Sequence, residues 1–248
     1  MHRHIKLNGP VSLNQYALPL EIAHTSHWLH ALLQSSHFRS DIQAKVCSST
    51  EPGVSAPPLA PDEGLRTVVA VLPEQIQAAE HLVRRRYSWR GYHVASTDDA
   101  ERLAPGVKGH PVTLLAEDGG KLLATLTVRP DSAKGLLAEE SYRPEIERLR
   151  REGRRLGELV KLAVEEGADW KAALNALVQA AYLVTSVVHA LTDVLIEVNP
   201  RHVRFYQRVF GFAIAAAERV CARAAAPSVL MLLDLVQFGQ RLELRAAA

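Results

Sequence analysis

The chain has 248 residues, of which 48% are hydrophobic and 23% are charged, and its formal net charge is +2. This composition is typical of a globular protein with an adequate core, and so small a net charge does not indicate a nucleic-acid partner. The two cysteines, Cys47 and Cys221, have no paired spacing, which excludes a disulfide scaffold and a cysteine-based zinc site and fits a reducing cytoplasm.

The N-terminal quarter of the chain is predicted to stand apart from the main domain. Its first residues lack the apolar stretch of a signal peptide, so we expect a cytoplasmic protein. Residues 1–47 form an N-terminal extension with a predicted helix over 20–37, and residues 48–64 form a linker rich in Pro, Ser and Gly. His24, His27 and His30 share one side of that helix, but without an acidic partner they do not indicate a metal site.

A catalytic domain is predicted over residues 65–240, followed by a short tail over 241–248. Its first half is expected to contain, in chain order, a strand over 67–72, a helix over 73–89, strands over 112–117 and 121–129, a helix over 142–151 and a strand over 156–164. Asp118-Gly119-Gly120 joins the second and third strands, and glycine supplies the positive φ of a tight turn, so a β-hairpin is predicted there.

The second half of this domain begins with a long apolar helix over 170–189. Polar residues interrupt its most hydropathic part, so a buried amphipathic helix is expected rather than a membrane span. A short strand over 194–198 follows and stops at Asn199-Pro200, which caps the next helix. That helix ends at Gly211, and strands over 212–220 and 228–235 are expected to complete the sheet as an antiparallel pair.

The stretch from Asp193 to Phe212 therefore combines a strand, an Asn-Pro stop, an amphipathic helix and a Gly-Phe pair. This combination resembles the C-terminal part of the GNAT acyltransferase fold. The Asn-Pro-Arg-His string and the segment from Gly157 to Val164 narrow the resemblance to the FeeM-like N-acyl amino acid synthases, which are related to the autoinducer synthases. The resemblance covers about residues 67–235. It implies an α+β fold with three α/β/α layers and a mixed, mainly antiparallel central sheet.

To join an acyl thioester to an amine, a base must remove a proton from the ammonium group and the thioester carbonyl must be polarised. The thiolate must also be protonated as it leaves. Glu158 matches a Glu of the autoinducer synthases, and Lys161 takes the position of their Arg. An acid within an apolar strand is costly to bury, which favours Glu158 as a base or as an anchor for the substrate ammonium. The alternative is a strand-end carboxylate paired with a nearby Arg.

Strand alternation would place Glu158 and Lys161 on opposite faces of the sheet. A bulge between them, which the fold suggests, would bring the two side chains to one side.

Three further residues are candidates for substrate binding. Arg86 matches the Arg of an Arg-Tyr pair in the first helix of the related enzymes, and Arg129 corresponds to an Arg near the small substrate of the autoinducer synthases. Either guanidinium is suited to clamp the carboxylate of an amino acid. Asn199, where the strand stops, completes the set with Lys161, although lysine lacks the bidentate fork of arginine.

Tyr206 is the candidate general acid for the leaving thiolate, a role that Tyr fills in many GNAT enzymes. It lies seven residues after Asn199, which is the common spacing, but five residues before Gly211 where four is usual. One residue rotates a helix by about 100°, so catalysis and core packing both stay open for this side chain.

The loop that holds the coenzyme A pyrophosphate in GNAT enzymes reads Glu165-Glu166-Gly167-Ala168-Asp169-Trp170 here. Two carboxylates facing a pyrophosphate would repel it. We therefore expect no tightly bound cofactor, and an acyl-phosphopantetheine on an acyl carrier protein as the donor rather than acyl-CoA. Carrier proteins are acidic, so Arg201, Arg204 and Arg208 are candidates for the surface that receives one.

These patterns predict an N-acyltransferase that joins a fatty acyl chain from an acyl carrier protein to the amine of an amino acid. The long apolar helix would help to form an acyl tunnel. An acyl-homoserine-lactone synthase and a non-catalytic module that binds acyl chains or carrier proteins are the alternatives. No metal, nucleic acid or membrane span is expected.

Overall fold

A computed structural model describes residues 64–88, 109–221 and 223–246 of the chain. The predicted N-terminal extension, its helix over 20–37 and its three histidines lie outside the described residues, as does the predicted linker apart from Gly64. Nothing in the structure therefore tests those predictions.

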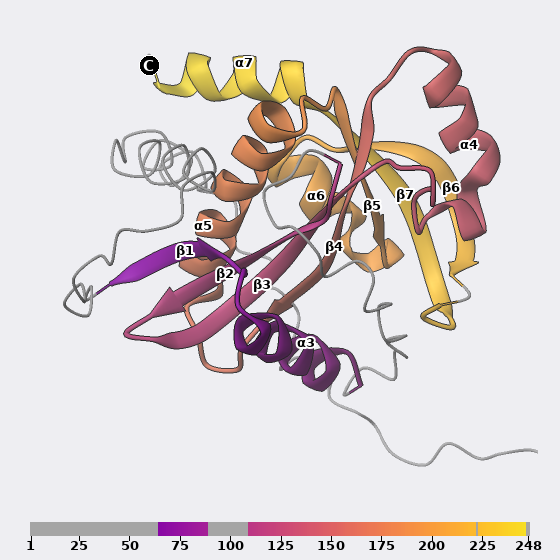
Figure 1. The fold of residues 1–248 in the computed structure, drawn as a ribbon. Coiled ribbons are helices and arrows are strands. Elements are labelled where there is room, and N and C mark those ends of the chain that lie inside the picture. The colour runs from indigo at the N-terminus through magenta and orange to yellow at the C-terminus, as the bar shows by residue number, and fades with distance from the viewer. Residues whose placement is uncertain (1–63, 89–108, 222, 247–248) are drawn as a thin grey trace, which may run out of the picture.

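The centre of the molecule is a seven-stranded sheet in the order β1-β2-β3-β4-β5-β7-β6, with every neighbouring pair antiparallel except β4 and β5 (Figure 1). Its strands are β1 (Leu65–Val69), β2 (Val112–Asp118), β3 (Lys121–Pro130), β4 (Leu156–Val164), β5 (Asp193–Val198), β6 (Ala213–Cys221) and β7 (Ala226–Asp234). The predicted hairpin between β2 and β3 is confirmed, with Gly119 and Gly120 both at positive φ. The final antiparallel pair is also confirmed.

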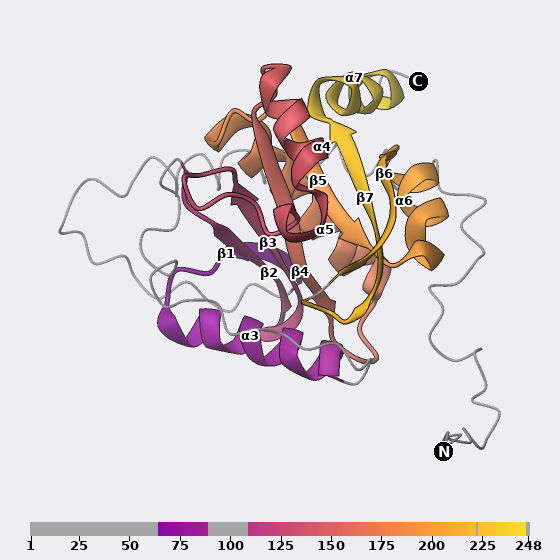
Figure 2. The same cartoon turned by 90° about the vertical axis from the view of Figure 1, so that its right-hand side faces the viewer.

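Helices cover both faces of this sheet, which gives three layers (Figures 1 and 2). On one face lie α3 (Pro73–Ser88) and α4 (Glu139–Arg151), and Tyr142, Ile146 and Leu149 of α4 pack against Leu195 and Leu230 of the sheet. The other face carries α5 (Trp170–Leu183), its π-helical extension η3 (Val184–Val188), α6 (Val203–Val209) and α7 (Leu235–Ala246). The predicted α+β fold of α/β/α layers with a mixed, mainly antiparallel sheet is confirmed.

The alternation of side chains along each strand explains why two separate cores form. On β5, Val194, Ile196 and Val198 join the apolar cluster beneath α5, α6 and α7, whereas Leu195 joins the cluster beneath α4. Residues two apart therefore face the same layer, and Glu197 faces the α4 side with Leu195. This assignment of faces decides what each strand residue can contribute to a site.

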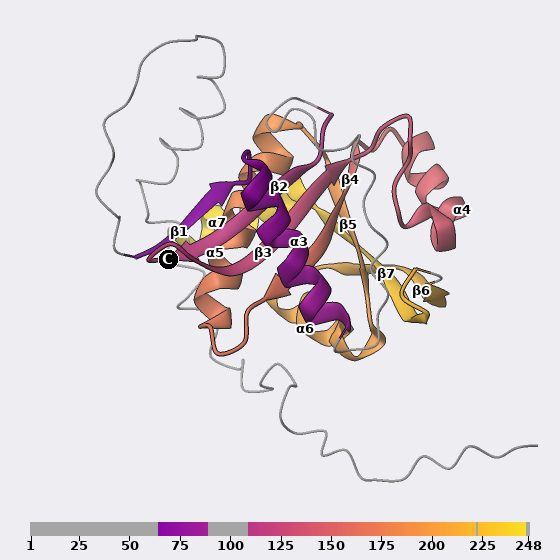
Figure 3. The same ribbon diagram turned by 60° about the horizontal axis from the view of Figure 1, so that its bottom comes forward.

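Strand β4 is irregular at its centre, and this irregularity opens the sheet. Between Thr127 and Thr125 of β3, the register with β4 jumps from Val160 to Ala163, so β4 contains one extra residue there. Lys161 in this bulge has a φ of 56°, which L-residues with a side chain rarely adopt. The predicted bulge is confirmed. Beyond Glu158, β4 no longer pairs with β5, and the two strands splay apart (Figure 3).

Helix α7 is the element that the sequence pattern did not predict. It begins at Leu235, crosses the expected domain boundary at residue 240 and continues to Ala246. At the other end of the domain, β1 spans residues 65–69 rather than 67–72. Helix α4 begins three residues earlier than expected, because Glu139 and Glu140 extend it ahead of a kink at Tyr142 and Pro144.

The helix over 170–188 is the segment, within the described ranges, whose length and composition would suffice to cross a membrane. In the fold, its Ala173, Leu177 and Ala180 pack fully buried against β2 and β3. Tertiary packing thus gives this apolar face a partner inside the protein.

Candidate active site

The splay between β4 and β5 opens into a cavity of about 880 Å³. Ile196 and Glu197, which face opposite sides of the sheet, both line it, so the cavity reaches both faces. The lining of the α5 side is apolar. Its apolar residues include Leu174, Val178, Ala181, Tyr182, Phe205, Phe210, Phe212, Leu233, Leu235 and Phe238. The α4 side is charged, with Arg129, Lys134, Glu158, Glu197 and Arg223. We name these two parts the apolar arm and the charged arm.

Glu158 stands at the point where the splay begins. It is 3% exposed, and its two oxygens accept hydrogen bonds from the main-chain N–H groups of Leu137 (2.8 Å) and Ala138 (2.6 Å). Ala138 is the N-cap residue of α4 and offers no side-chain cap of its own. The carboxylate of Glu158 therefore satisfies donors at the start of α4, which an uncapped helix would leave unpaired.

Arg129 lies directly opposite Glu158 in the register of β3 and β4, with its Nε 3.8 Å from Glu158 Oε2. Both side chains are almost completely buried. Burial raises the pKa of Glu158 above its usual range, although the N–H groups of Ala138 and Leu137 and the charges of Arg129 and Arg223 act in the opposite direction. Glu158 is thus paired with a nearby arginine, as the structural alternative expected, and it also lines the cavity, while its role as a base or an ammonium anchor stays a prediction.

A second charged group, which the sequence pattern did not single out, lies in the charged arm. Arg223 donates to both Glu197 and the carbonyl oxygen of Leu137, and Ser228 Oγ donates to Glu197 at 3.0 Å. Tyr142 of α4 donates to the carbonyl oxygen of Ser228 at 2.7 Å. One signal for Glu197 was present, because it is an acid within an apolar strand, as Glu158 is. Arg223 and Ser228 gave no such signal.

The predicted substrate-binding residues Arg86 and Lys161 both line the cavity but at different places. Lys161 sits in the bulge of β4. Arg86 is at the end of α3, where its Nη1 lies 3.2 Å from Glu166 Oε2, and its neighbour Arg85 pairs with Glu165 at 2.5 Å. Arg129, and not Arg86, is therefore the arginine next to Glu158. The two glutamates of the loop between β4 and α5 are also neutralised by arginines, which weakens the repulsion expected from the sequence.

Asn199 and Tyr206 line the cavity from the start and the middle of the segment after β5. Asn199 Oδ1 accepts from the N–H of Arg201 at 3.2 Å, so its side chain caps the following turn, η4 (Pro200–His202). The ring of Tyr206 packs edge-on against Phe205 and Phe212, with centroids 5.3 and 5.8 Å apart. Tyr206 is thus both part of an aromatic cluster and a wall of the cavity.

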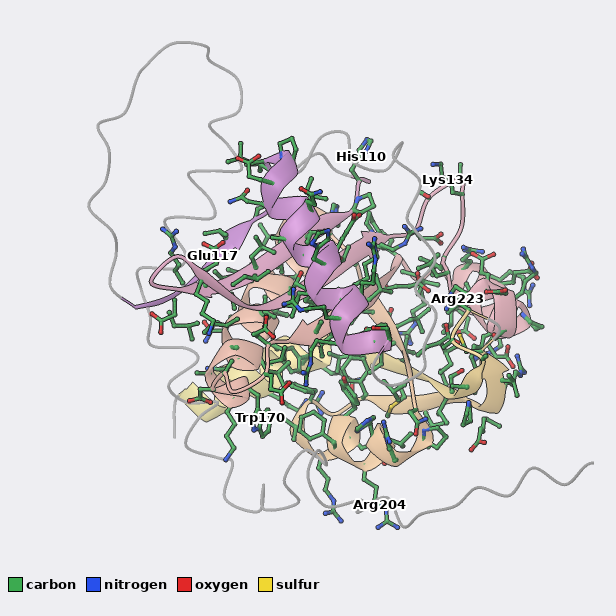
Figure 4. The ribbon with its side chains drawn as sticks, turned by 90° about the horizontal axis from the view of Figure 1, so that it is seen from below. His110, Glu117, Lys134, Trp170, Arg204 and Arg223 are labelled. Carbon is green, nitrogen blue, oxygen red and sulfur yellow. The ribbon has the colours of Figure 1, made fainter. Side chains whose placement is uncertain are left out.

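Arg201, Arg204 and Arg208 are exposed, and none of them lines the cavity. Figure 4 shows Arg204 pointing from α6 into solvent at the bottom of the view, while Lys134 lies towards the top and Arg223 at the right-hand edge. Arg201 of η4 and Arg204 and Arg208 of α6 therefore lie on the outside of this segment, away from the residues that line the cavity. Within the ranges that the structure describes, no group of His, Cys, Asp and Glu side chains is arranged to hold a metal ion.

A family model described as "N-acyl amino acid synthase FeeM" matches residues 78–234. Among solved structures, FeeM, an N-acyl amino acid synthase from uncultured soil microbes, superposes with a TM-score of 0.64 at 23% identity, covering 75% of this chain and 98% of that chain. Escherichia coli ElaA gives a TM-score of 0.48 at 12% identity, with 69% and 99% coverage. An acyl-CoA N-acyltransferase from Pseudomonas aeruginosa gives 0.47 at 14%, with 68% and 99% coverage. No curated protein is significantly similar in sequence.

Proposed function

The chain belongs to the FeeM family of N-acyl amino acid synthases and is an N-acyltransferase, and from this premise we propose its donor and acceptor. The donor is a fatty acyl chain held as a thioester on the phosphopantetheine arm of an acyl carrier protein. The acceptor is the amino group of an amino acid. The observation that carries this proposal is the single cavity whose apolar and charged arms meet at the splay of β4 and β5.

Each arm suits one of the two substrates. Leu, Val and aromatic side chains of the apolar arm bury the hydrocarbon of an acyl chain, at about 0.8 kcal/mol for each methylene. The charged arm offers a guanidinium for a carboxylate and a carboxylate for an ammonium, which are the two charges of an amino acid. Because the arms lie on opposite faces of the sheet, the substrates meet only at the splay.

At the splay, the main chain of β4 beyond Glu158 has no strand partner on the β5 side. Its N–H groups on that side are suited to polarise the thioester carbonyl and to stabilise the oxyanion, each such donor being worth about 10²- to 10³-fold in rate. The amine attacks the carbonyl carbon, the C–N bond forms and the C–S bond breaks. The reaction requires no covalent enzyme intermediate.

Two side chains are assigned to the proton transfers. Glu158 takes the proton of the substrate ammonium, directly or through water. A carboxylate has about four lone-pair sites, and the N–H groups of Leu137 and Ala138 use two of them. The raised pKa of Glu158 makes its carboxylate a better base than an exposed one. Tyr206 protonates the leaving thiolate from the opposite wall of the cavity.

Arg129 is the arginine best placed to bind the carboxylate of the amino acid, because it lies beside Glu158. Arg86 stands by the loop between β4 and α5, with Lys161 farther along the wall of the cavity. We assign Arg86 and Lys161 to the phosphopantetheine end, where their positive charges face the arm of the donor. Asn199 positions η4 at the same end by capping it.

The decisive experiment is mass spectrometry of lipid extracts from a bacterial host that overexpresses the protein. New N-acyl amino acids are expected, and their masses would identify both the amino acid and the acyl chain. Acyl-homoserine lactones would instead assign the chain to autoinducer synthesis. Unchanged extracts, together with no product from purified protein, acyl carrier protein thioester and a mixture of amino acids, would refute the proposed reaction.

A further inference from the structure

Helix α7 closes the apolar arm of the cavity. Leu235 and Phe238 of α7 are 4% and 5% exposed, and both line the cavity. The ring of Phe238 meets the ring of Tyr182 on α5 at a centroid distance of 5.5 Å, inclined by 63°. Two aromatic rings from different helices thus form one wall.

Two glycines show how closely α7 approaches its neighbours. A Cβ atom at Gly239 would collide with the hydroxyl group of Tyr182, and a Cβ atom at Gly211, just after α6, would collide with the guanidinium of Arg241. Helix α7 therefore touches α5 on one side and the end of α6 on the other. It spans the gap between these helices across the end of α5 that carries Tyr182 (Figure 1).

The cavity follows α5 along most of its length. Its lining begins with the loop over 165–168 and Trp170 and extends to Thr185, a rise of about 22 Å along the helix axis at 1.5 Å per residue. Because α5 runs antiparallel to the end of β4 that it follows, Trp170 lies at the open end of the splay. Tyr182, Thr185 and α7 lie at the far end. A donor that enters beside Trp170 would direct the methyl end of its chain towards α7.

The match to the FeeM family model ends at residue 234, immediately before α7 begins at Leu235. We infer that α7 sets the upper limit on the length of the acyl chain, and that Phe238 is the residue that determines this specificity. The inference rests on the proposed function for its acyl substrate, but it concerns residues outside the matched region. The remaining wall of the apolar arm comes from the common core.

Binding of straight-chain fatty acids, from octanoic to octadecanoic acid, tests this assignment without requiring the reaction. Affinities are measured by calorimetry with the full-length protein. For the wild type, affinity should rise with chain length and then stop rising. In Phe238→Leu, the rise should continue to longer chains by about fourfold for each further methylene, which corresponds to about 0.8 kcal/mol. In Phe238→Trp, the rise should stop at shorter chains.

Val236→Ala is the matched control, because Val236 lies on the same helix and is 62% exposed. Its length profile should equal that of the wild type. Identical profiles for all four proteins, or no binding of any fatty acid by the wild type, would overturn the inference. Fatty-acid binding with a shifted profile, but without N-acyl products either in the host or from the purified protein with acyl carrier protein thioester, would support the role of α7 and refute the proposed reaction. Products whose chain lengths shift with the variants would support both.

Discussion

At the scale of single residues, Glu158 has a structural task, to which the proposed function adds a chemical one. Its carboxylate holds the main-chain N–H groups at the start of α4 and faces Arg129 across the strand pair. The same side chain also lines the cavity. The pair of observations makes Glu158 the residue whose substitution tells most about the site.

We expect Glu158→Gln to lower kcat/KM for amide formation by about 10²- to 10⁴-fold, the range of a general base. The wild-type rate should fall as the pH drops through the raised pKa of Glu158, because only the ionised form accepts a proton. This acid limb should lie above the pKa of an ordinary glutamate and be absent from the variant. Steady-state kinetics over a range of pH measure it. Unchanged product formation by the variant would exclude Glu158 as the base.

Thermal denaturation of the same two proteins separates chemistry from folding. Since burial raises the pKa of Glu158 in the folded state, the folded protein binds this proton more tightly than the unfolded chain does. The stability that the protonated group contributes is therefore present at low pH and lost as the pH rises through the raised pKa. As the pH rises from the pKa of an unfolded glutamate through the raised pKa of Glu158, the Tm of the wild type should therefore decrease relative to the Tm of Glu158→Gln. Parallel Tm curves would contradict the desolvation of the carboxyl group.

At the scale of elements, the bulge in β4 carries a backbone strain that a glycine would relieve. Lys161 has a φ of 56°, where any Cβ costs about 1–2 kcal/mol. Lys161→Gly and Lys161→Ala both remove the ammonium group, but only the alanine variant keeps a Cβ. The glycine variant should therefore be more stable than the alanine variant by about 1 kcal/mol in urea denaturation. Equal stability of the two variants would show that the bulge relaxes.

Helix α4 is held to the sheet by ion pairs as well as by its apolar face. Arg150 Nε lies 2.7 Å from Asp131 Oδ2, and its Nη2 also bonds Glu139. Burial by itself would raise the pKa of Glu139, but the hydrogen bonds from Arg150 and the Leu136 N–H outweigh it, and the pKa is lowered. The hydrogen bond from Arg219 lowers the pKa of Glu145 in the same way.

We therefore expect α4 to loosen in acid. A carboxylate whose pKa is depressed by folding contributes stability above its unfolded pKa, near 4.5, and loses it as the pH falls through the folded value. Amide hydrogen exchange in α4 should accelerate as the pH falls below about 4.5, beyond the intrinsic change in exchange rate. Glu145→Gln should reduce this acid dependence, whereas Glu147→Gln, at an exposed position of the same helix, should leave it unchanged. Identical behaviour of both variants would refute the assignment.

At the scale of the whole molecule, the three layers separate the places to which the proposed function assigns the two substrates. The sheet divides the apolar arm from the charged arm, and the outer face of η4 and α6 with Arg201, Arg204 and Arg208 is separate from both. A partner that delivers the acyl chain can thus contact the surface while its prosthetic arm reaches the splay.

If this surface receives an acidic carrier protein, the reaction should depend on salt. We expect kcat/KM with acylated carrier protein to fall steeply as ionic strength rises, since steering acts over a Debye length of about 10 Å at 0.1 M. At low salt, Arg204→Glu should have a lower kcat/KM with acylated carrier protein than the wild type. With a small acyl-pantetheine thioester as donor, kcat/KM should depend neither on salt nor on this substitution. The same losses with both donors would place Arg204 in the site rather than on a docking surface. Equal rates with the carrier protein at all salt concentrations would exclude steering.

The sequence by itself determined most of the local elements, although not α7, and it indicated the family. Gly119-Gly120 specified a hairpin, and the stretch from Asp193 to Phe212 specified a strand, an Asn-Pro cap and a helix, because turn and cap chemistry acts between neighbours along the chain. The resemblance to the family indicated the bulge in β4. The cost of an acid in an apolar strand singled out Glu158, which lines the cavity.

Only the tertiary structure decided which distant residues meet. Arg223 reaches Glu197 across 26 positions, and Arg86 reaches Glu166 across 80, so neither contact has a local signal. Helix α7 closes the apolar arm only because β7 delivers it beside α5, which depends on the order of the strands. Short-range patterns fix elements because their energies are local, whereas the site is assembled by the order and splay of the strands.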